Sequence, residues 1–182
     1  MFNNVRVQSR NGTSLESHER RQHAYDFLST HPVGVLATTD PDCEPHAAVI
    51  YFSVDEHMTV SFLTRSGTKK YDNLMHFDHA ILTVYDPKTQ SVGQVIGRAV
   101  EVTDPDAVNE IAAENMKACL QTSDGGLPPI TKLYEGDVVA FRLFPVEVRL
   151  AIYSRPDPGD YSKMFETMDS YELKADDLTL DG

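Results

Sequence analysis

The chain has 182 residues, of which 41% are hydrophobic and 24% are charged, and its formal net charge is −12. This length and composition suit one domain with a sizeable core. The acidic balance excludes a general nucleic-acid binder, because phosphate contacts need a basic surface. No apolar run approaches the roughly 18 residues of a membrane span, and the start lacks the apolar core of a secretory signal. The two cysteines, Cys43 and Cys119, form no motif. We therefore expect a cytoplasmic protein with reduced thiols.

Hydrophobic periodicity and turn residues predict strands interspersed with helices. The elements expected, in chain order, are a helix from Thr13 to about Ser29, strands over residues 33–39, 46–54 and 58–63, a helix over 69–77, strands over 80–85 and 91–103, a helix from Asp104, and a strand over 138–153 interrupted at Pro145. Residues 46–54 are apolar on both faces, which favours a strand that is covered on both sides. Gly93 and Gly97 fall inside a strand and indicate a bulge, a bend or the close approach of another group.

The spacing of these elements predicts the fold class. Turn signals are close together and no βαβ rhythm repeats, which favours a mainly β (α+β) fold of about six antiparallel strands, closed or nearly closed into a barrel, with flanking helices. We divide the chain into a loose N-terminal segment (residues 1–12), a barrel domain (13–154) and an acidic C-terminal appendage (155–182). The appendage carries eight acidic and three basic residues and is expected to be solvated.

The segment Thr64-Arg65-Ser66-Gly67-Thr68-Lys69-Lys70 has the chemistry of an anion site. It joins the end of a predicted strand to the first turn of a predicted helix, where backbone N–H groups and the helix dipole favour negative charge. Gly67 permits a tight turn, the hydroxyl groups can donate hydrogen bonds, and the two lysines supply full charges. In so acidic a chain, a cationic pocket this local indicates a small phosphorylated ligand. The alternative is an ordinary strand-to-helix turn whose lysines lie in solvent.

Residues 30–103 resemble the FMN-binding split-barrel family of pyridoxamine 5′-phosphate oxidase and its relatives. The motifs that carry the resemblance are, in order, Val35-Leu36-Ala37-Thr38, Pro45-His46 at the start of the next strand, Thr64 at a strand end, Gly67-Thr68-Lys69-Lys70, Lys70-x-x-Asn73-Leu74, and Val95-Ile96-Gly97-Arg98-Ala99. Residues 138–153 match weakly as the last strands. The resemblance implies a six-stranded split barrel that forms a homodimer, with FMN in the cleft between the two subunits.

The resemblance also implies which residues hold the cofactor. The flavin phosphate would be bound by Ser66, Thr68, Lys69 and Lys70, with Thr64 and Arg65 nearby. The ring would lie along the second strand, against the backbone of Ala48, Val49, Ile50 and Tyr51, and Gln94 would reach the ring or the ribityl chain. The implied activity is a flavin-dependent oxidoreductase, in which hydride moves between a small donor or substrate and N5 of FMN. No residue is assigned as a catalytic acid or base.

Departures from the family pattern argue against vitamin B6 oxidation. The true oxidases carry an arginine for the flavin phosphate and a lysine for the substrate phosphate on the second strand, where this chain has Ala48 and Phe52. Gln94 stands two residues from the usual glutamine. The chain has no tryptophan, and Arg149-Leu150-Ala151 does not reproduce the Arg-Leu-His motif of the true oxidases. We therefore expect a relative that keeps the residues that bind the flavin and differs in the residues that would contact the substrate.

Alternatives within the same fold stay open. The first is a reductase that uses the deazaflavin F420. Its phosphorylated tail would bind at the same segment, residues 64–70, which we call the lysine turn. The second is a non-catalytic flavin-binding module of the stress-response type. A haem-binding variant also exists in this superfamily, but no histidine here is well placed as its ligand.

Other candidate residues receive structural interpretations. His76 and His79 suggest a metal site, but a helix end followed by a turn gives a poor chelating geometry and no third ligand is evident, so no metal is expected. His46, at the mouth of the second strand, is interpreted as a surface or hydrogen-bonded histidine in preference to a ligand contact. The C-terminal arginines are interpreted as members of ordinary ion pairs, in preference to contacts with the flavin of a partner subunit. They are Arg142, Arg149 and Arg155.

Overall fold

The computed structural model describes residues 17–122, 137–153, 168–174 and 178. Its elements are α1 (Ser17–Thr30), β1 (Val33–Thr39), β2 (Pro45–Val54), β3 (Val60–Arg65), α2 (Lys69–His76), β4 (His79–Asp86), β5 (Ser91–Val102), α3 (Pro105–Thr122), β6 (Val138–Tyr153) and β7 (Met168–Lys174). The predicted helix start at Thr13 lies outside the described residues. Every other predicted helix and strand is present, with ends that differ by a few residues. The predicted interruption at Pro145 is wrong, because β6 continues through this residue, which pairs with Gly97.

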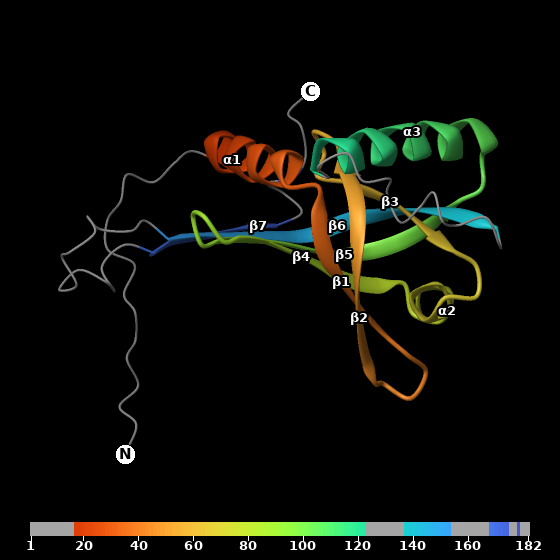
Figure 1. Cartoon of the computed structure of the whole chain (residues 1–182). Coiled ribbons are helices and arrows are strands. Elements are labelled where there is room, and N and C mark those ends of the chain that lie inside the picture. Colours follow the sequence, from red (N-terminus) through yellow and green to blue (C-terminus); the bar gives the residue numbers. More distant parts are fainter. Residues whose placement is uncertain (1–16, 123–136, 154–167, 175–177, 179–182) are drawn as a thin grey trace, which may run out of the picture.

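The strands close into a barrel. All seven belong to one antiparallel sheet in the order β3-β2-β1-β4-β5-β6-β7, and an additional pairing of β3 with β6 joins the first six into a ring (Figure 1). The length of β6 permits this closure, because its first residues pair with β3 and its last residues pair with β7. The predicted six-stranded antiparallel barrel with flanking helices is therefore confirmed.

The seventh strand was not expected from the sequence. β7 pairs with β6 from Tyr153↔Met168 to Glu147↔Lys174. Leu173 of this strand is 1% exposed and joins the hydrophobic core. Part of the acidic C-terminal segment is thus built into the sheet, while the limits of the three predicted segments remain predictions.

Aspartates build two of the hairpin turns in the same way. Oδ1 of Asp40, at the β1–β2 turn, accepts the backbone N–H groups two and four residues later, at 3.0 and 2.8 Å. Asp55 does the same at the β2–β3 turn, at 2.9 and 2.8 Å. The fourth residue of each turn, Cys43 or Met58, has a positive φ angle, of 65° and 60° respectively. The carboxylates thus satisfy backbone donors that the turns would otherwise leave free, which explains the aspartates that marked these turns in the sequence.

The core fills the barrel interior with the inward-facing residues of each strand. Phe52, Phe62 and Phe141 come from the neighbouring strands β2, β3 and β6 and are at most 1% exposed. The rings of Phe62 and Phe141 stack with centroids 5.6 Å apart. Leu28 of α1 and Leu74 of α2 belong to the same core, so apolar contacts fix both helices to the barrel.

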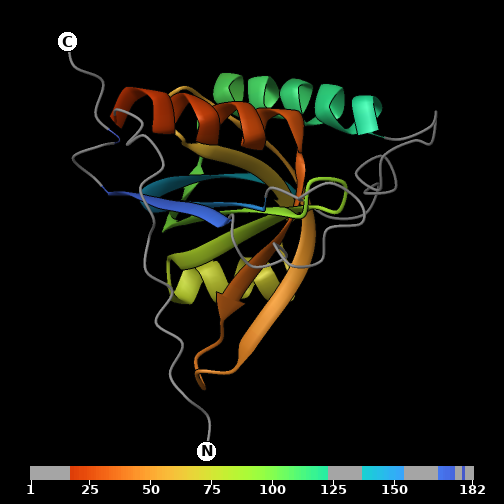
Figure 2. The same cartoon turned by 90° about the vertical axis from the view of Figure 1, so that its left-hand side faces the viewer.

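The helices cover only part of the barrel. α1 and α3 lie on one side, and α2 lies on the opposite side near the projecting β1–β2 hairpin (Figures 1 and 2). α3 packs on β2 and β3, where Asn115 Nδ2 donates to the backbone oxygen of Ser61 at 3.1 Å. The prediction that residues 46–54 are covered on both sides holds for the second half of β2 only, because Val49 in the first half is 68% exposed.

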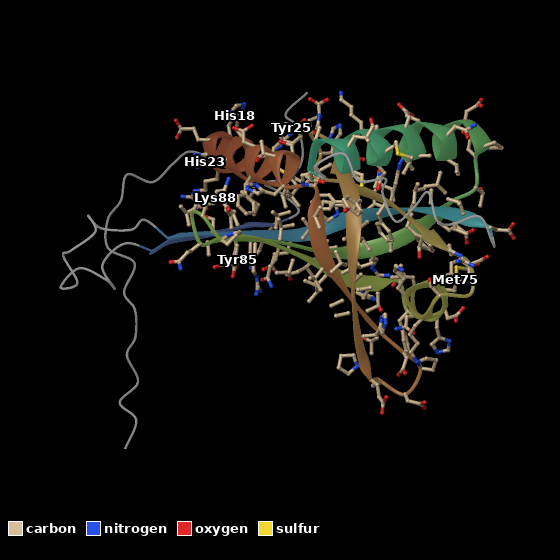
Figure 3. All side chains as sticks on the ribbon, viewed as in Figure 1. His18, His23, Tyr25, Met75, Tyr85 and Lys88 are labelled. Atoms are coloured by element: carbon tan, nitrogen blue, oxygen red, sulfur yellow. The ribbon has the colours of Figure 1, made fainter. Side chains whose placement is uncertain are left out.

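An apolar surface lies on the outer side of β1, β2, β4 and β5. It carries Val35, Val49, Ile81, Tyr85 and Val100, which are 39–68% exposed. Figure 3 shows Tyr85 on the side of the sheet away from α1. We call these five side chains the open sheet face. Five exposed apolar side chains therefore share one face of the sheet.

β5 and β6 change register at Gly97. Gly97 pairs with Pro145, and the register shifts immediately before it. A Cβ atom at this position would lie 2.1 Å from the backbone oxygen of Phe144. The irregularity predicted for this strand is therefore confirmed at Gly97, since glycine lets the two backbones approach this closely. A Cβ atom at Gly93 would instead meet the ring of Phe27 in α1 at 2.9 Å.

We predict that Gly97→Ala lowers the free energy of unfolding by about 3 kcal/mol, because a backbone and not a flexible side chain must move. Urea denaturation followed by circular dichroism measures the change. Leu120→Ala, at an exposed position of α3 outside the open sheet face, is the control and should alter stability by less than about 1 kcal/mol. A Gly97→Ala protein as stable as the wild type would contradict the close approach.

Candidate functional site

The loop between β3 and α2 is a turn that uses its threonine hydroxyls internally. Thr68 is the N-cap of α2: its Oγ1 accepts the N–H of Tyr71 at 3.4 Å and donates to the backbone oxygen of Arg65 at 2.9 Å. The Thr64 hydroxyl lies 3.1 Å from that of Thr68. Gly67 has φ of +77°, and a Cβ atom there would meet nothing within 4 Å, so the backbone conformation and not the lack of space favours glycine. Thr64 and Thr68 therefore hold the turn together.

Other donors at the start of α2 remain available. The N–H groups of Lys69 and Lys70 precede the first intrahelical bond, from Asp72 to Thr68 at 3.0 Å, and have no partner within the helix. The helix dipole adds partial positive charge at this end. The hydroxyl of Ser66, which is half-buried, makes no hydrogen bond to another described residue. This end of α2 thus keeps donors for an anion after the turn has been built.

Lys70 is the lysine of the turn without an acidic partner among the described residues. Its side chain is half-buried, and burial lowers the pKa of Lys70 below that of an ordinary lysine. Asn73 and Leu74, about one helical turn later, are buried, so Lys70 lies on the side of α2 that faces the barrel. A partly desolvated ammonium group gains more from a bound anion than a solvated one does.

Lys69 is paired with an aspartate that the sequence analysis did not select. Its Nζ lies 2.8 Å from Oδ2 of Asp40, whose side chain is only 7% exposed. Their hydrogen bond is the largest cause that raises the pKa of Lys69 and lowers the pKa of Asp40. The two residues are 29 positions apart, so no sequence spacing pointed to this pair.

Within the described part of the chain, the first half of β2 has a free backbone edge. It pairs with β1 over residues 45–51, whereas its pairing with β3 covers only residues 52–54. An unpaired edge presents N–H and C=O groups that need partners. α2 lies against this hairpin, because Asn73 Nδ2 donates to Thr38 Oγ1 of β1 at 3.0 Å and Lys69 contacts Asp40. The free edge and the lysine turn therefore belong to adjoining elements.

The main-chain groups on this edge can be followed from Phe52. Its N–H donates to the carbonyl group just before β1, at 3.0 Å. Because such groups alternate in direction along an antiparallel strand, those of Ala48 and Ile50 also face β1, whereas those of Val49 face the free edge. Ala47, which the sequence analysis did not select, faces the same edge.

Gln94 lies away from this edge within one chain. The residues directly opposite one another across β2, β1, β4 and β5 are Val49, Val35, Thr83 and Gln94. Three strand spacings of about 4.8 Å thus separate Val49 from Gln94, roughly 14 Å in all. Gln94 Nε2 donates to Thr83 Oγ1 at 3.3 Å. One chain brings the β2 edge and the lysine turn together but does not add Gln94 to them.

Two buried nitrogen atoms on these elements have no hydrogen-bond partner among the residues that the structure describes: Nδ1 of His46 and Nε of Arg65. His46 is half-buried on β2 opposite Thr38, the residue that contacts α2. Arg65 is half-buried at the end of β3, directly before the turn. Buried polar atoms are normally satisfied, so these two indicate places where a water molecule or a ligand belongs.

The remaining candidates make surface contacts. His79 Nδ1 lies 2.9 Å from Asp78, which also contacts Arg98 at 3.3 Å. In the described part of the chain, no three His, Cys, Asp or Glu side chains gather as possible metal ligands. Arg149 pairs with two glutamates, one on β6 and one on β7, and Arg155 lies outside the described residues. The described helices include none that is both long and apolar enough to cross a membrane.

The fold is similar to that of several solved proteins. One is a protein from Clostridium acetobutylicum related to general stress protein 26, of the pyridoxinephosphate oxidase family (TM-score 0.63, 10% identity, 91% of this chain and 100% of that one). Another is a heme-binding protein from Mycobacterium smegmatis (TM-score 0.61, 18% identity, 87% and 59%). A third is an F420 reductase (TM-score 0.54, 21% identity, 68% and 94%). At these identities the likeness shows the fold alone.

Sequence comparison identifies the family. The curated proteins include no significant match to the chain. The family model described as pyridoxamine 5′-phosphate oxidase matches residues 21–150, which is more than half of the sequence. This match agrees with the closed barrel and with the motifs that suggested the resemblance. The chain belongs to the pyridoxamine 5′-phosphate oxidase family.

Proposed function

We propose that the protein binds FMN and acts as a flavin-dependent oxidoreductase on a small molecule. The observation that carries this proposal is Lys70, a half-buried cation without an acidic partner among the described residues, at a helix start that adjoins a free strand edge. FMN has a phosphate at one end and a ring with polar edge groups at the other. The two features of the site match these two ends.

The phosphate end would bind at the start of α2. Lys70 supplies a full charge, and the N–H groups of Lys69 and Lys70 supply donors that the helix leaves free. The Ser66 hydroxyl adds a further donor at the preceding turn. The guanidinium group of Arg65, whose Nε lacks a partner among the described residues, is a second cationic group within the same segment. These groups fit a phosphate ester better than a neutral ligand, which would leave the half-buried charge of Lys70 without a counter-charge.

The ring end would bind along the first half of β2. The isoalloxazine edge offers both hydrogen-bond donors and acceptors, and the free backbone groups of Ala47 and Val49 complement such a mixture. The exposed side chain of Val49 would lie next to the ring, where an apolar contact suits its faces. Backbone recognition of this kind needs no particular side chain. Ala48 and Ile50, whose backbone groups face β1, would not take part in it.

The chemistry of the reaction would come from the cofactor, since N5 of a bound flavin accepts or gives hydride. The residues of the chain bind and orient the flavin, and we assign none of them as a catalytic acid or base. Vitamin B6 oxidation is not proposed. Phe52, at the position where a substrate-binding lysine would be expected, is 0% exposed in the core and has no access to a substrate.

The site would be completed by a second copy of the chain. The open sheet face includes Val49, so a partner that covers this face also approaches the β2 edge. Gln94 lies roughly 14 Å along the sheet from Val49 and would reach the ring only from the other subunit. We therefore propose a homodimer with two equivalent flavin sites.

The purified protein should bind added FMN and then show the absorbance spectrum of a flavin. Lys70→Ala should raise the dissociation constant for FMN 30- to 100-fold, which corresponds to the loss of about 2–3 kcal/mol from a charge-assisted phosphate contact. Fluorescence titration measures the affinity. Lys88→Ala, at an exposed turn, is the control and should leave it unchanged. Unchanged affinity in Lys70→Ala would contradict the site, and exclusive binding of F420 or haem would contradict the choice of cofactor.

The lowered pKa of Lys70 predicts a pH dependence. Phosphate binds the protonated lysine, so the affinity for FMN relative to riboflavin, which lacks the phosphate, should fall as the pH rises through the pKa of Lys70. The fall should begin below about pH 10.4, the value for an ordinary lysine, because burial already disfavours the charge. Lys70→Arg should keep the preference for FMN to higher pH. A ratio that does not vary with pH in the wild type would argue against a Lys70–phosphate contact.

The dimer predicts a response to charge on the open sheet face. Ile81→Asp should convert a dimer of 20.3 kDa chains into monomers, since a buried unpaired carboxylate opposes association. Sedimentation equilibrium measures the mass. Leu120→Asp, at an exposed apolar position of α3 outside this face, should leave the dimer intact. A monomeric wild type, or an Ile81→Asp dimer of unchanged affinity, would refute the interface.

A further inference from the structure

We propose that Lys69 is not a phosphate ligand and that Asp40 and Lys69 form a positioning pair, which fixes the β1–β2 hairpin against α2. The proposal rests on the flavin site described above. It assigns different roles to two adjacent lysines, which their sequence alone does not distinguish. It also assigns a role to Asp40, which lies in a turn and outside the predicted site.

The hydrogen bonds of Asp40 support this assignment. Its Oδ1 accepts the N–H groups of Asp42 and Glu44, and its Oδ2 accepts from Lys69 at 2.8 Å. The side chain of Asp40 is 7% exposed, so water has little access to replace a lost partner. If Lys69 moved to a phosphate, a nearly buried carboxylate would lose its counter-charge, which is strongly unfavourable. Lys70, in contrast, forms no ion pair with a described residue.

The pair connects the two halves of the proposed site. Asp40 ends the β1 side of the hairpin whose second strand carries the free edge, and Lys69 begins the helix that carries Lys70. A second contact, from Asn73 to Thr38 at 3.0 Å, joins the same two elements. Together these contacts hold the hairpin, and with it the β2 edge that would bind the ring, in one position. An edge that is free to move would bind any flavin less tightly, with or without a phosphate.

The two possible roles of Lys69 predict opposite effects of Asp40→Asn. If Lys69 bound the phosphate, loss of the carboxylate would release it from a competitor and FMN would bind as tightly or more tightly. If the pair is a positioning device, Asp40→Asn weakens binding. Riboflavin separates the roles again, because removing a phosphate ligand affects FMN alone whereas moving the hairpin affects both flavins.

The test measures FMN and riboflavin affinities for Asp40→Asn, Lys69→Met, the double variant, Lys69→Arg and Lys70→Met. We expect Asp40→Asn and Lys69→Met each to weaken both flavins about 3- to 10-fold, with the double variant no weaker than either, since the two act as a unit. Lys69→Arg should restore most of the affinity. The ratio of FMN to riboflavin affinity, and its salt dependence, should change only in Lys70→Met.

Two results would overturn the proposal: tighter FMN binding by Asp40→Asn, or a loss in Lys69→Met that affects FMN and not riboflavin. If the wild type binds neither flavin, the proposed function fails, and amide hydrogen exchange then tests the pair by itself. Exchange at Asp42 and Glu44 should accelerate in Lys69→Met. Unchanged protection there would refute the fixing of the hairpin.

Discussion

The pairing of β3 with β6 is the interaction on which the barrel and its candidate site depend. It runs from Val60↔Leu143 to Arg65↔Val138, and the N–H of Ser66 extends it by one bond to the carbonyl group of Asp137, at 3.1 Å. The last bonds of the closure therefore hold the first residues of the lysine turn. β6 pairs with β3 through its first residues and with β7 through its last residues, and the register of its pairing with β5 shifts between these two parts. The close approach of the two backbones at Gly97 accommodates this shift. A change that opened the barrel would consequently displace the start of α2 as well.

The turn uses some of its polar groups for its own structure and leaves others available for the proposed binding of a ligand. Thr64 and Thr68 satisfy each other and the backbone, Lys69 satisfies Asp40, and the groups left over are Lys70, the Ser66 hydroxyl and the first N–H groups of α2. A cation that is half-buried without a counter-charge lowers stability. It is retained most readily where a ligand compensates for it, and such local conflicts between stability and function are common at binding sites.

Much of the fold follows from local sequence signals, because alternating apolar residues and turn-forming aspartates act over a few positions. The lysine turn was predictable for the same reason. β7 was not, since its acidic surroundings outweigh the short alternation that places Leu173 in the core. The Asp40–Lys69 pair and the separation of Gln94 from the β2 edge depend on which strands are neighbours. Strand order is set by the whole chain, so spacing along the sequence could not reveal either.

The charge balance of the site limits how one chain can hold a phosphate ester. The net charge of −12 opposes the approach of anions at long range, so affinity has to come from contacts within the site. With Lys69 neutralised by Asp40, Lys70 contributes one positive charge against a phosphate group that carries nearly two negative charges near neutral pH. The helix dipole supplies part of the difference. Arg65, whose buried Nε lacks a hydrogen-bond partner among the described residues, is the guanidinium group nearest to Lys70 along the chain and would add a further positive charge to the proposed site.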